Sequence, residues 1–567
     1  MKTTRKALLL VAPLLLLASC GSKSSADASI QSIDPSVYSG SEATGTFSIT
    51  SSDGTYTSTD SQVTITSGGT FTLSGSYSGI IVIEAGESDT VELDLNGVSL
   101  SSSSNSPIFA SSADKVKIKA IKDTYNTITD SRSAKTTDST SQGEGAIYAK
   151  CDLSLVGKGT LIIVGNYNDG IHCTKDLTIK NQNLKVTAYA DAIQGNNSLT
   201  IEENPTLLAI GGADGLKTSE SSITSSGKQK GTISIVGGTV EVQAYEDAID
   251  AAYNVVIAQG SYTDDDNVTQ TTIPSITLLT NKYATALSSY SVETPTLTPL
   301  KFGGPNGGGQ PSGGEQGNTN TAESTAKGIK AANKITISNG AVSMKVYDDG
   351  IHADYGGTLE NGSTGVGDIE ISGGNISIYA TDDAIHADRY LTISGGTINV
   401  SYSYEALEGT VITISGGSTT VYGEDDGVNA SKKINTITPA LNVTGGTLDV
   451  TIGSGDTDGI DSNGNITISG GTVVTRGAPG GSSMATGIDC DGTAKVTGGL
   501  LVCFGSPETK PTAGTGVSTQ TISGTYSAGT YTIKNSSISV TTTNTTGSYS
   551  GIYIWSSYGT GFTATKA

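Results

Sequence analysis

The sequence predicts an all-β protein, a right-handed parallel β-helix with coils of about 22 residues. The first observation is an acidic element that recurs along most of the chain, as in residues 347–354 (YDDGIHAD) and 381–388 (TDDAIHAD). The second is its period, because the shortest distances between copies are 21 to 23 residues. The third is the segment between copies, such as residues 390–400 (YLTISGGTINV), which alternates apolar and polar residues around a Gly pair. Such units stack because none can bury its apolar face alone.

Each repeat is expected to supply three short strands. The alternating segment gives two strands joined by a tight turn at the Gly pair. The acidic element gives the third, in which Ile385 and Ala387 point one way and His386 the other. We therefore expect an inward set of residues in the core. These are Ile351, Ile385, Ile398 and Val400.

The chain begins with a predicted lipoprotein signal peptide over residues 1–20. Basic residues precede a short apolar run that ends in Leu17-Ala18-Ser19-Cys20-Gly21, which indicates a lipobox with Cys20 as the lipidated residue. The alternative is a plain secretory signal with an incidental cysteine. Residues 21–44 are rich in Ser and Ala and are expected to form a flexible tether. We therefore expect an extracytoplasmic, surface-exposed protein that is lipid-anchored to the cell membrane or the outer membrane.

The remainder is predicted to be one continuous domain. Residues 45–142 are expected to form the N-terminal cap and first coils, because they alternate without the acidic element. Residues 143–506 form the acidic-repeat β-helix, interrupted by a disordered Gly-rich insertion at 301–325. Residues 507–567 supply the C-terminal strands, which close an edge that would otherwise be unpaired.

Composition limits the partners. The net charge of -22 disfavours nucleic acid and anionic lipid and attracts divalent cations, so membrane contact is expected through the lipid anchor only. We expect a monomer. Of the cysteines other than Cys20, Cys151 and Cys173 lie 22 residues apart on neighbouring repeats, where a disulfide and two buried thiols are both compatible with the sequence.

Stacking is expected to align equivalent residues in columns about 4.8 Å apart. Like charges at this spacing repel by about 1 kcal/mol in water and about 3 to 4 kcal/mol near a protein surface, so we expect a cation in an acidic column. The acidic column contains Glu144, Asp169, Asp191, Asp214, Asp247, Asp349, Asp383, Glu405, Asp426 and Asp458. The neighbouring outward column contains Tyr148, His172, Gln194, Lys217, Asp250, Lys330, His352, His386, Glu408, Asn429, Asp461 and Asp489.

Carboxylate and carbonyl oxygens favour calcium as the cation. The alternative is that the acids cap turns by accepting backbone N–H groups. His352 and His386 form a histidine pair next to carboxylates. This pair indicates a transition-metal site, a catalytic base, or simply polar residues stacked on the solvent face. The predicted calcium ligands are Asp247, Asp250, Asp349, Asp354, Asp383, Asp388, Glu405, Glu408, Asp426, Asp458 and Asp461.

The acidic repeats, the segment 393–398 (ISGGTI), the leading segment 93–98 (LDLNGV) and the Gly-rich insertion together resemble a family of bacterial extracellular carbohydrate-binding proteins. The resemblance covers residues 45–506 and implies a pectin-lyase-like right-handed β-helix that binds cellulose or polygalacturonate, with calcium on repeat Asp residues and without cleavage. Several repeats depart from the Asp pattern, at Gln194, Lys330 and Asn429.

Three functions follow as hypotheses. The first is a surface lipoprotein that binds a polysaccharide through a calcium-bearing acidic face. The second is a polysaccharide lyase, which needs a metal at the uronate carboxylate and a Lys or Arg base, with Lys217, Lys330 and Arg389 as candidates. The third is a structural or adhesive solenoid. The residues expected to contact ligand are His352, His386, Lys330, Arg389 and Tyr404, with Tyr379, Tyr402 and Tyr422 as flat surfaces for sugar rings.

Overall fold

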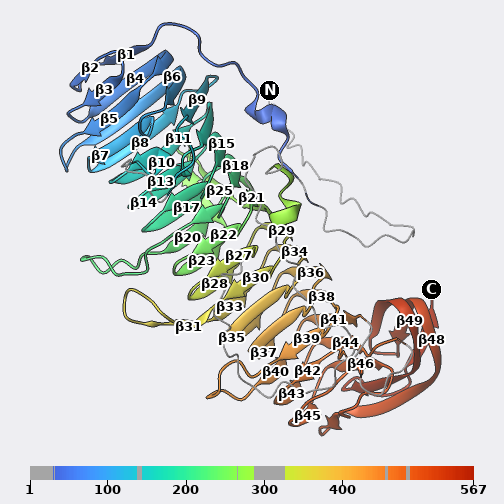
Figure 1. The fold of residues 1–567 in the computed structure, drawn as a ribbon. Coiled ribbons are helices and arrows are strands. Elements are labelled where there is room, and N and C mark those ends of the chain that lie inside the picture. The colour runs from blue at the N-terminus through green and yellow to red at the C-terminus, as the bar shows by residue number, and fades with distance from the viewer. Residues whose placement is uncertain are drawn as a thin grey trace, which may run out of the picture.

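The computed structural model describes residues 30, 32–136, 143–264, 266–286, 326–453, 457–479 and 485–567. Its regular structure there is β-strand apart from the short 3-10 helices η1 (Pro35–Tyr38) and η2 (Asn281–Tyr283), so the all-β prediction is confirmed. One large sheet holds 46 strands. The strands follow one another in chain order along an elongated molecule, from β1 (Ser48–Ser51) at one end to β49 (Ser539–Ser556) at the other (Figure 1).

Most strands pair in parallel with the equivalent strand of the next repeat. For example, β10 (Gly145–Ala149) pairs with β13 (Asp169–Cys173), which pairs with β16 (Ile193–Gly195). The sheet therefore consists of three parallel ladders, numbered 1 to 3 by the order of their strands within a repeat.

From β10 onward, the acidic element begins the strands of ladder 1. Ladder 1 runs through β3 (Gln62–Ile65), β5 (Ile80–Glu84), β7 (Ile108–Ser112), β10, β13, β16, β19 (Leu216–Lys217), β22 (Ile249–Ala251), β27 (Ile329–Ala331), β30 (Ile351–Ala353), the starts of β35 (Ile385–Ile393) and β37 (Leu407–Ile414), β39 (Val428–Ala430) and β42 (Asp461–Ser462).

Ladders 2 and 3 carry the two alternating segments. Ladder 2 runs through the starts of β4 (Gly69–Ser78) and β6 (Thr90–Ser102), then β8 (Lys115–Ala120), β11 (Asp152–Gly157), β14 (Asp176–Lys180), β17 (Ser198–Glu202), β20 (Thr232–Ile235), β23 (Asn254–Ile257), β28 (Lys334–Ile337), β33 (Asp368–Ile371), the ends of β35 and β37, β40 (Ala440–Val443), β43 (Asn465–Ile468), β45 (Ala494–Val496) and β47 (Thr512–Ala513). Ladder 3 runs through the ends of β4 and β6, then β9 (Tyr125–Asp130), β12 (Thr160–Gly165), β15 (Asn183–Ala188), β18 (Thr206–Gly211), β21 (Thr239–Ala244), β26 (Ser275–Thr280), β29 (Ala341–Lys345), β34 (Asn375–Tyr379), β36 (Thr397–Tyr402), β38 (Ser418–Gly423), β41 (Thr447–Ile452), β44 (Thr472–Arg476) and β46 (Leu500–Phe504).

The core lies between the ladders and is filled by aliphatic columns. In ladder 1 the register places Ile351 beside Ile385 in the next repeat. Both side chains are fully buried, and Ile398 and Val400 are 1% and 2% exposed, which confirms the predicted inward set. Burying each such side chain contributes roughly 1.5–3 kcal/mol. The apolar columns therefore fix the register that aligns the polar residues outside.

The Gly pair between ladders 2 and 3 is required by its geometry. Gly396 has φ +83°, a region that L-residues with a side chain avoid. A Cβ at this position would lie 2.9 Å from the backbone of Gly373 in the preceding repeat. The second glycine of the pair therefore allows both the turn and its close stacking.

Antiparallel strands close both ends. At the N-terminal end, β1 pairs with β4, and β2 (Tyr56–Ser58) pairs with β3. At the C-terminal end, β49 pairs with both β46 and β48 (Ser518–Lys534), and β50 (Thr563–Lys566) covers β48. The expected C-terminal closure is thus observed. Two antiparallel hairpins leave the ladders, β24 (Gly260–Thr263) with β25 (Thr269–Thr272), and β31 (Tyr355–Thr358) with β32 (Thr364–Val366).

Part of the segment expected as a flexible tether is attached to the domain. The Ile33 backbone N–H donates to Glu241 Oε2 at 2.6 Å, and the Tyr38 hydroxyl donates to the Thr206 carbonyl oxygen at 3.3 Å. Both Ile33 and Tyr38 are buried, so residues 32–44 differ from a free linker because their apolar side chains find a place on the outside of ladder 3.

The predicted signal peptide, Cys20 and the insertion 301–325 lie outside the described residues. Within the described ranges, no helix has the length and apolar character needed to cross a membrane. Cys151 and Cys173 are free, buried thiols, and the Cys173 thiol lies 3.2 Å from the Cys151 carbonyl oxygen. Burial raises the pKa of Cys151 to about 11, so both residues act as small core side chains in this structure.

Candidate functional site

The acidic column lies at the start of ladder 1, and each of its aspartates accepts a backbone N–H of the next repeat with one oxygen. Asp169 Oδ1 accepts the backbone N–H of Asp191 at 3.1 Å, and Asp191 Oδ1 accepts that of Asp214 at 3.0 Å. The same contact joins Asp349 to Asp383 at 3.1 Å. Turn capping, one of the two roles considered for these acids, is therefore present. It recurs for Asp214, Asp247, Asp383, Asp426 and Asp458.

The other carboxylate oxygen faces the outward column, whose alignment matches the predicted order as far as Asp461. Register pairs Lys330 with His352, His352 with His386, and His386 with Glu408. Further pairs connect Glu408 to Asn429 and Asn429 to Asp461. The outward column is therefore a continuous row of polar side chains beside the acids.

In the first half of this row the protein supplies its own cations. Lys217 Nζ lies 2.7 Å from Asp214 Oδ2 and 3.2 Å from Asp191 Oδ2. Lys330 Nζ lies 3.3 Å from Asp247 Oδ2 and 4.0 Å from Asp250 Oδ1. These lysines occupy positions where the sequence predicted a cation, and they neutralise the repulsion between stacked carboxylates.

The pKa of Asp250 reflects the crowding of these carboxylates. Burial, with Asp214 and Asp247 nearby, raises its pKa to about 7 even though Lys330 acts in the opposite direction. The oxygens of Asp214, Asp247 and Asp250 lie close enough together to share one ion. Lysine pairing and metal binding would therefore compete at this part of the row.

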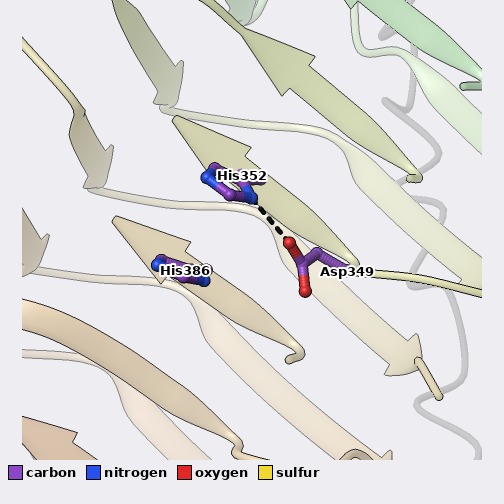
Figure 2. Close-up of side chains that lie close together, drawn as sticks. All are labelled: Asp349, His352 and His386. Carbon is purple, nitrogen blue, oxygen red and sulfur yellow. Dashed lines mark hydrogen bonds and ion pairs between the residues drawn. The ribbon is translucent and has the colours of Figure 1, made fainter. Parts of the chain in front are cut away.

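Two histidines stack in the middle of the row. The ring centroids of His352 and His386 are 4.3 Å apart and the planes differ by 14°. His352 Nδ1 lies 2.6 Å from Asp349 Oδ2, and Figure 2 shows the other nitrogen of each ring directed away from Asp349. His386 Nδ1 lies 3.0 Å from both Asp383 Oδ2 and Glu408 Oε2. Although burial opposes it, these acids raise the pKa of His386 well above its usual value.

Asp354 and Asp388 flank the far side of the same rings. His352 Nε2 lies 3.2 Å from Asp354 Oδ1, and His386 Nε2 lies 3.2 Å from Asp388 Oδ1. Asp349, Asp354, Asp383 and Asp388, all four predicted as calcium ligands, therefore lie around the two histidines.

The other residues expected to contact ligand are engaged with partners of their own. Arg389 forms a two-pronged pair with Asp368 at 2.7 and 2.6 Å on ladder 2. Tyr404 is 36% exposed, and burial and its hydrogen bond to Asp425 raise its pKa. Arg389 and Tyr404 are therefore each paired with a carboxylate other than those beside the histidine pair.

The predicted tyrosines form a stack of their own on ladder 3. Tyr379 and Tyr402 have centroids 5.2 Å apart, and Tyr402 and Tyr422 have centroids 6.0 Å apart. Because the rings stack on one another, much of their flat area is already in contact. The stack therefore presents mainly ring edges and hydroxyl groups to a ligand, and little of the flat ring faces.

The last part of the row is a cluster of oxygen donors that we call the oxygen cluster, Glu405, Asp426, Asn429, Asp458 and Asp461. Within the described ranges, none of its carboxylates forms an ion pair with a lysine, arginine or histidine. Burial, reinforced by neighbouring acids, raises the pKa of Asp426 to about 8 and the pKa values of Asp458 and Asp461 to about 6.

Two oxygens of the oxygen cluster are buried without a partner. Asn429 Nδ2 donates to Glu405 Oε1 at 2.9 Å, yet Glu405 Oε2 and Asn429 Oδ1 accept no hydrogen bond. Buried polar atoms of this kind are rare and costly. The side chains of the oxygen cluster offer only oxygen as a metal ligand, and oxygen ligands suit a hard cation such as calcium.

Sequence reasoning missed two features. Lys327 takes the place of the acid in one repeat, and its Nζ lies 2.5 Å from Asp349 Oδ2 and 3.1 Å from Asp348 Oδ1. A basic hollow of about 500 Å³ on ladder 2 is lined by Lys117, Lys119 and Lys180 among others. The alternation of lysines in residues 115–119 is a visible signal of this hollow, but it fits ordinary strand alternation equally well.

The raised pKa values predict how stability depends on pH without metal. Folded Asp426, Asp458 and Asp461 retain protons that the unfolded chain releases above about pH 4. The free energy of unfolding should therefore decrease as pH rises to about 8, and the melting temperature in chelator should be several degrees lower at about pH 8.5 than at about pH 5.

The matched variant is Asp426→Asn, which keeps the oxygen that caps Asp458 but carries no charge. It should raise the melting temperature in chelator at the higher pH and change it little at the lower pH. The raised pKa of His386 also makes the folded protein more stable at low pH, but this residue is unchanged in the variant. Equal pH profiles for the variant and the native protein would show that Asp426 is not the source.

The chain is similar to one family of known proteins and to one solved structure. The model of the family "carbohydrate-binding domain-containing protein" matches residues 59–368 and 356–509. A protein of that description from Acetivibrio thermocellus is 30% identical over 198 residues, which cover 35% of this chain and 68% of the relative. A solved structure described as a polysaccharide lyase-like protein from C. thermocellum, a gadolinium derivative, is 28% identical, covers 40% of this chain and 84% of its own, and has a TM-score of 0.34.

Proposed function

The chain belongs to the family of carbohydrate-binding domain-containing proteins, and on that premise we propose that it binds an extended polysaccharide without cleaving it. The proposed ligand is an acidic or β-linked plant-type glycan such as polygalacturonate or cellulose. Calcium held by the oxygen cluster would join protein and sugar, because a carboxylate surface and a polyuronate repel one another without it. The observation that carries the proposal is the pair of buried, unpartnered oxygens of Glu405 and Asn429.

The residues of the oxygen cluster fit calcium. Calcium takes six to eight oxygen ligands in flexible geometry, and the cluster offers carboxylate and amide oxygens from neighbouring repeats. Glu405 Oε2, Asn429 Oδ1 and the carboxylates of Asp426 and Asp461 would hold the ion, with water or sugar oxygens completing the shell. Asp247, Asp250, Asp349, Asp383 and Glu408 were also predicted as ligands, but each of their carboxylates faces a lysine or histidine of the protein.

The shape proposed for the molecule supports an extended ligand. We infer that the three parallel ladders form the turns of a right-handed β-helix, because equivalent strands pair repeat after repeat. Such a solenoid presents long straight rows of side chains. The row of ladder 1 would follow the polymer rather than enclose one sugar.

The state of the candidate bases favours binding over lysis. A lyase base must accept a proton from the sugar. Although burial acts in the opposite direction, acidic neighbours raise the pKa of Lys217 and of Lys330, and the pair with Asp368 raises the pKa of Arg389. All three side chains are therefore held in their protonated form.

Retention on immobilised polygalacturonate tests the proposal. We expect retention in calcium, release by chelator, and no unsaturated product by ultraviolet absorbance. The double variant Asp426→Asn, Asp461→Asn should lose about tenfold or more in calcium-dependent affinity, because ligand charge sets the affinity for calcium.

The matched control is Lys117→Gln, Lys119→Gln, which removes charge from the basic hollow instead. Retention that survives chelator and disappears in this lysine variant would place a polyanion on ladder 2 and contradict the calcium mechanism. Unsaturated product would favour the lyase. Absence of retention on polygalacturonate, cellulose and a broader glycan array would favour an adhesive role.

We also propose that the protein is a surface lipoprotein attached through Cys20. The support is the order of a basic start, a short apolar run and Leu17-Ala18-Ser19-Cys20. Changing Cys20→Ala should move the protein from the membrane fraction to the soluble fraction or leave it unprocessed. The same distribution for variant and native protein would contradict lipidation.

A further inference from the structure

A pocket lies at the C-terminal end of the molecule, where β46 ends but the closing hairpin continues. β46 pairs with β49 as far as Phe504, which lies opposite Ile552. The residues of β49 that precede Ile552 pair with β48 instead. The chain leaves β46 at Gly505, which has φ +84°. Between the departing chain and the hairpin is a pocket of about 650 Å³, a volume typical of ligand sites.

The walls of the pocket are connected to one another by hydrogen bonds. One wall is the segment after β44, where the Ala478 backbone N–H donates to the Ala485 carbonyl oxygen at 3.0 Å. The Glu508 backbone N–H donates to the Thr486 hydroxyl oxygen at 3.2 Å, which joins this segment to the chain after β46. On the hairpin side, the register of β48 shifts just before Thr525, as in a β-bulge, a feature that re-aims side chains beside binding sites.

The lining combines aromatic rings with hydroxyl groups. The rings are those of Phe504, Tyr549 and Tyr553. Glu508 is the one charged residue among the described residues that line the pocket, and its side chain is exposed. The hydroxyl groups of the lining, besides those of the tyrosines, belong to Thr486, Ser506, Thr525, Ser548 and Ser550. Apolar ring surface with a few polar groups suits a neutral molecule that carries hydroxyl groups of its own.

An independent observation comes from the hydroxyl group of Tyr549. The residue is 4% exposed and its ring centroid lies 5.8 Å from that of Phe504. Within the described ranges this hydroxyl has no hydrogen-bond partner. Tyr531 packs against the same phenylalanine and is equally buried, but its hydroxyl donates to the Ser527 carbonyl oxygen at 2.7 Å. Because a buried Tyr hydroxyl ordinarily finds a partner, that of Tyr549 is available to a ligand in the pocket.

We propose that this pocket binds a short stretch of a neutral glycan. A sugar ring would pack its C–H groups on Tyr553, which is half-buried, while its hydroxyl groups bond the Tyr549 hydroxyl and the Glu508 carboxylate. Hydrogen bonds to a carboxylate are stronger than those between neutral groups. A uronate would be repelled, because it has the same charge as Glu508 and no described lining residue is a cation.

The pocket is distinct from the calcium-dependent site proposed above, although the two are neighbours. The Thr486 backbone N–H donates to Asp458 Oδ1 of the oxygen cluster at 2.7 Å, and Thr486 also lines the pocket. The lining complements a neutral sugar without an ion, so the pocket does not rest on the proposed function. Removal of calcium should therefore leave binding in the pocket unchanged.

Calorimetric titration of the full-length mature protein in chelator tests the proposal. The probes are cellotetraose, xylotetraose and mannotetraose, with tetragalacturonate as their charged counterpart. We expect at least one neutral tetrasaccharide to bind with one-to-one stoichiometry, and tetragalacturonate to bind about tenfold more weakly or less. Tyr549→Phe should weaken the binding about fivefold, because one hydrogen bond to the sugar is lost. Its melting temperature should not decrease, since this hydroxyl has no partner in the protein to lose.

Tyr531→Phe is the matched control, because it removes a bonded hydroxyl from the same aromatic cluster. It should lower the melting temperature and leave the affinity for the tetrasaccharide unchanged. Glu508→Gln, at an exposed position, should weaken the binding about fivefold by removing the charge from its hydrogen bonds. The double variant Asp426→Asn, Asp461→Asn should bind the tetrasaccharide as the native protein does, even though it loses calcium-dependent retention on polygalacturonate.

Three results would overturn the pocket as a neutral-glycan site. The first is that none of the three neutral tetrasaccharides binds in chelator. The second is native affinity in Tyr549→Phe together with native affinity in Glu508→Gln. The third is tighter binding of tetragalacturonate than of the neutral probes. Each of these results would leave the calcium-dependent retention on polygalacturonate to be judged by its own variants.

Discussion

Replacement of Asp349 by alanine is expected to lower the free energy of unfolding by about 3 to 5 kcal/mol, the usual cost of removing one partner of a buried ion pair. Asp349 is 3% exposed, and its Oδ2 lies 2.5 Å from Lys327 Nζ. Lys327 is 8% exposed and would be left with Asp348 alone. The variant also loses the carboxylate that holds His352 and the acceptor for the Asp383 N–H.

The measurement is the urea midpoint in chelator, so that metal binding does not contribute. Asp348→Ala is the matched control, because Asp348 faces the same lysine but its side chain is 21% exposed, and we expect it to cost no more than about 1 kcal/mol. The combination Asp349→Leu, Lys327→Met should recover part of the loss, since it leaves no buried charge unpaired. Equal midpoints for Asp349→Ala and Asp348→Ala would contradict the buried pair.

The period of the sequence is sufficient to place residues in columns. Gly328 and Gly350 occupy equivalent positions in two successive repeats and are 22 residues apart. The paired strands β27 and β30 are offset by the same 22 residues, so the period alone aligns Lys330 with His352 correctly. The apolar alternation likewise determines which side chains face the core. Both results follow from the backbone, because a parallel ladder repeats the same geometry at every repeat.

The partners within a column were not predictable in the same way. Glu408 was predicted as a calcium ligand, but its carboxylate lies 3.0 Å from both His386 Nδ1 and Lys433 Nζ. Which neighbour a side chain contacts depends on its rotamer and on the charges in both adjacent repeats. The period of the sequence gives no information on the rotamer or on these charges. For the same reason the pairing of Lys327 with Asp348 and Asp349 was not predicted, because Lys327 occupies a position where other repeats have an acid.

The C-terminal closure was predicted as strands, but its main polar contact was not. Arg476 ends β44 and is fully buried. Its Nη1 donates to Asp449 Oδ1 and to the Val450 carbonyl oxygen, both at 2.6 Å. Its Nε donates to Asn544 Oδ1 at 2.8 Å, across to β49. One side chain thus joins ladder 3 to the closing hairpin.

Replacement of Arg476 by methionine is therefore expected to lower the free energy of unfolding of this end by about 3 to 5 kcal/mol. Methionine can fill part of the space beside Phe504, but it cannot donate to Asp449 or Asn544. Limited proteolysis should show faster cleavage within β48 and β49 than in the native protein. Lys495→Met, at an exposed position of β45, is the control and should leave the cleavage rate unchanged. Native-like resistance in Arg476→Met would mean that the hairpin is held by its apolar contacts alone, because those contacts remain when the guanidinium group is gone.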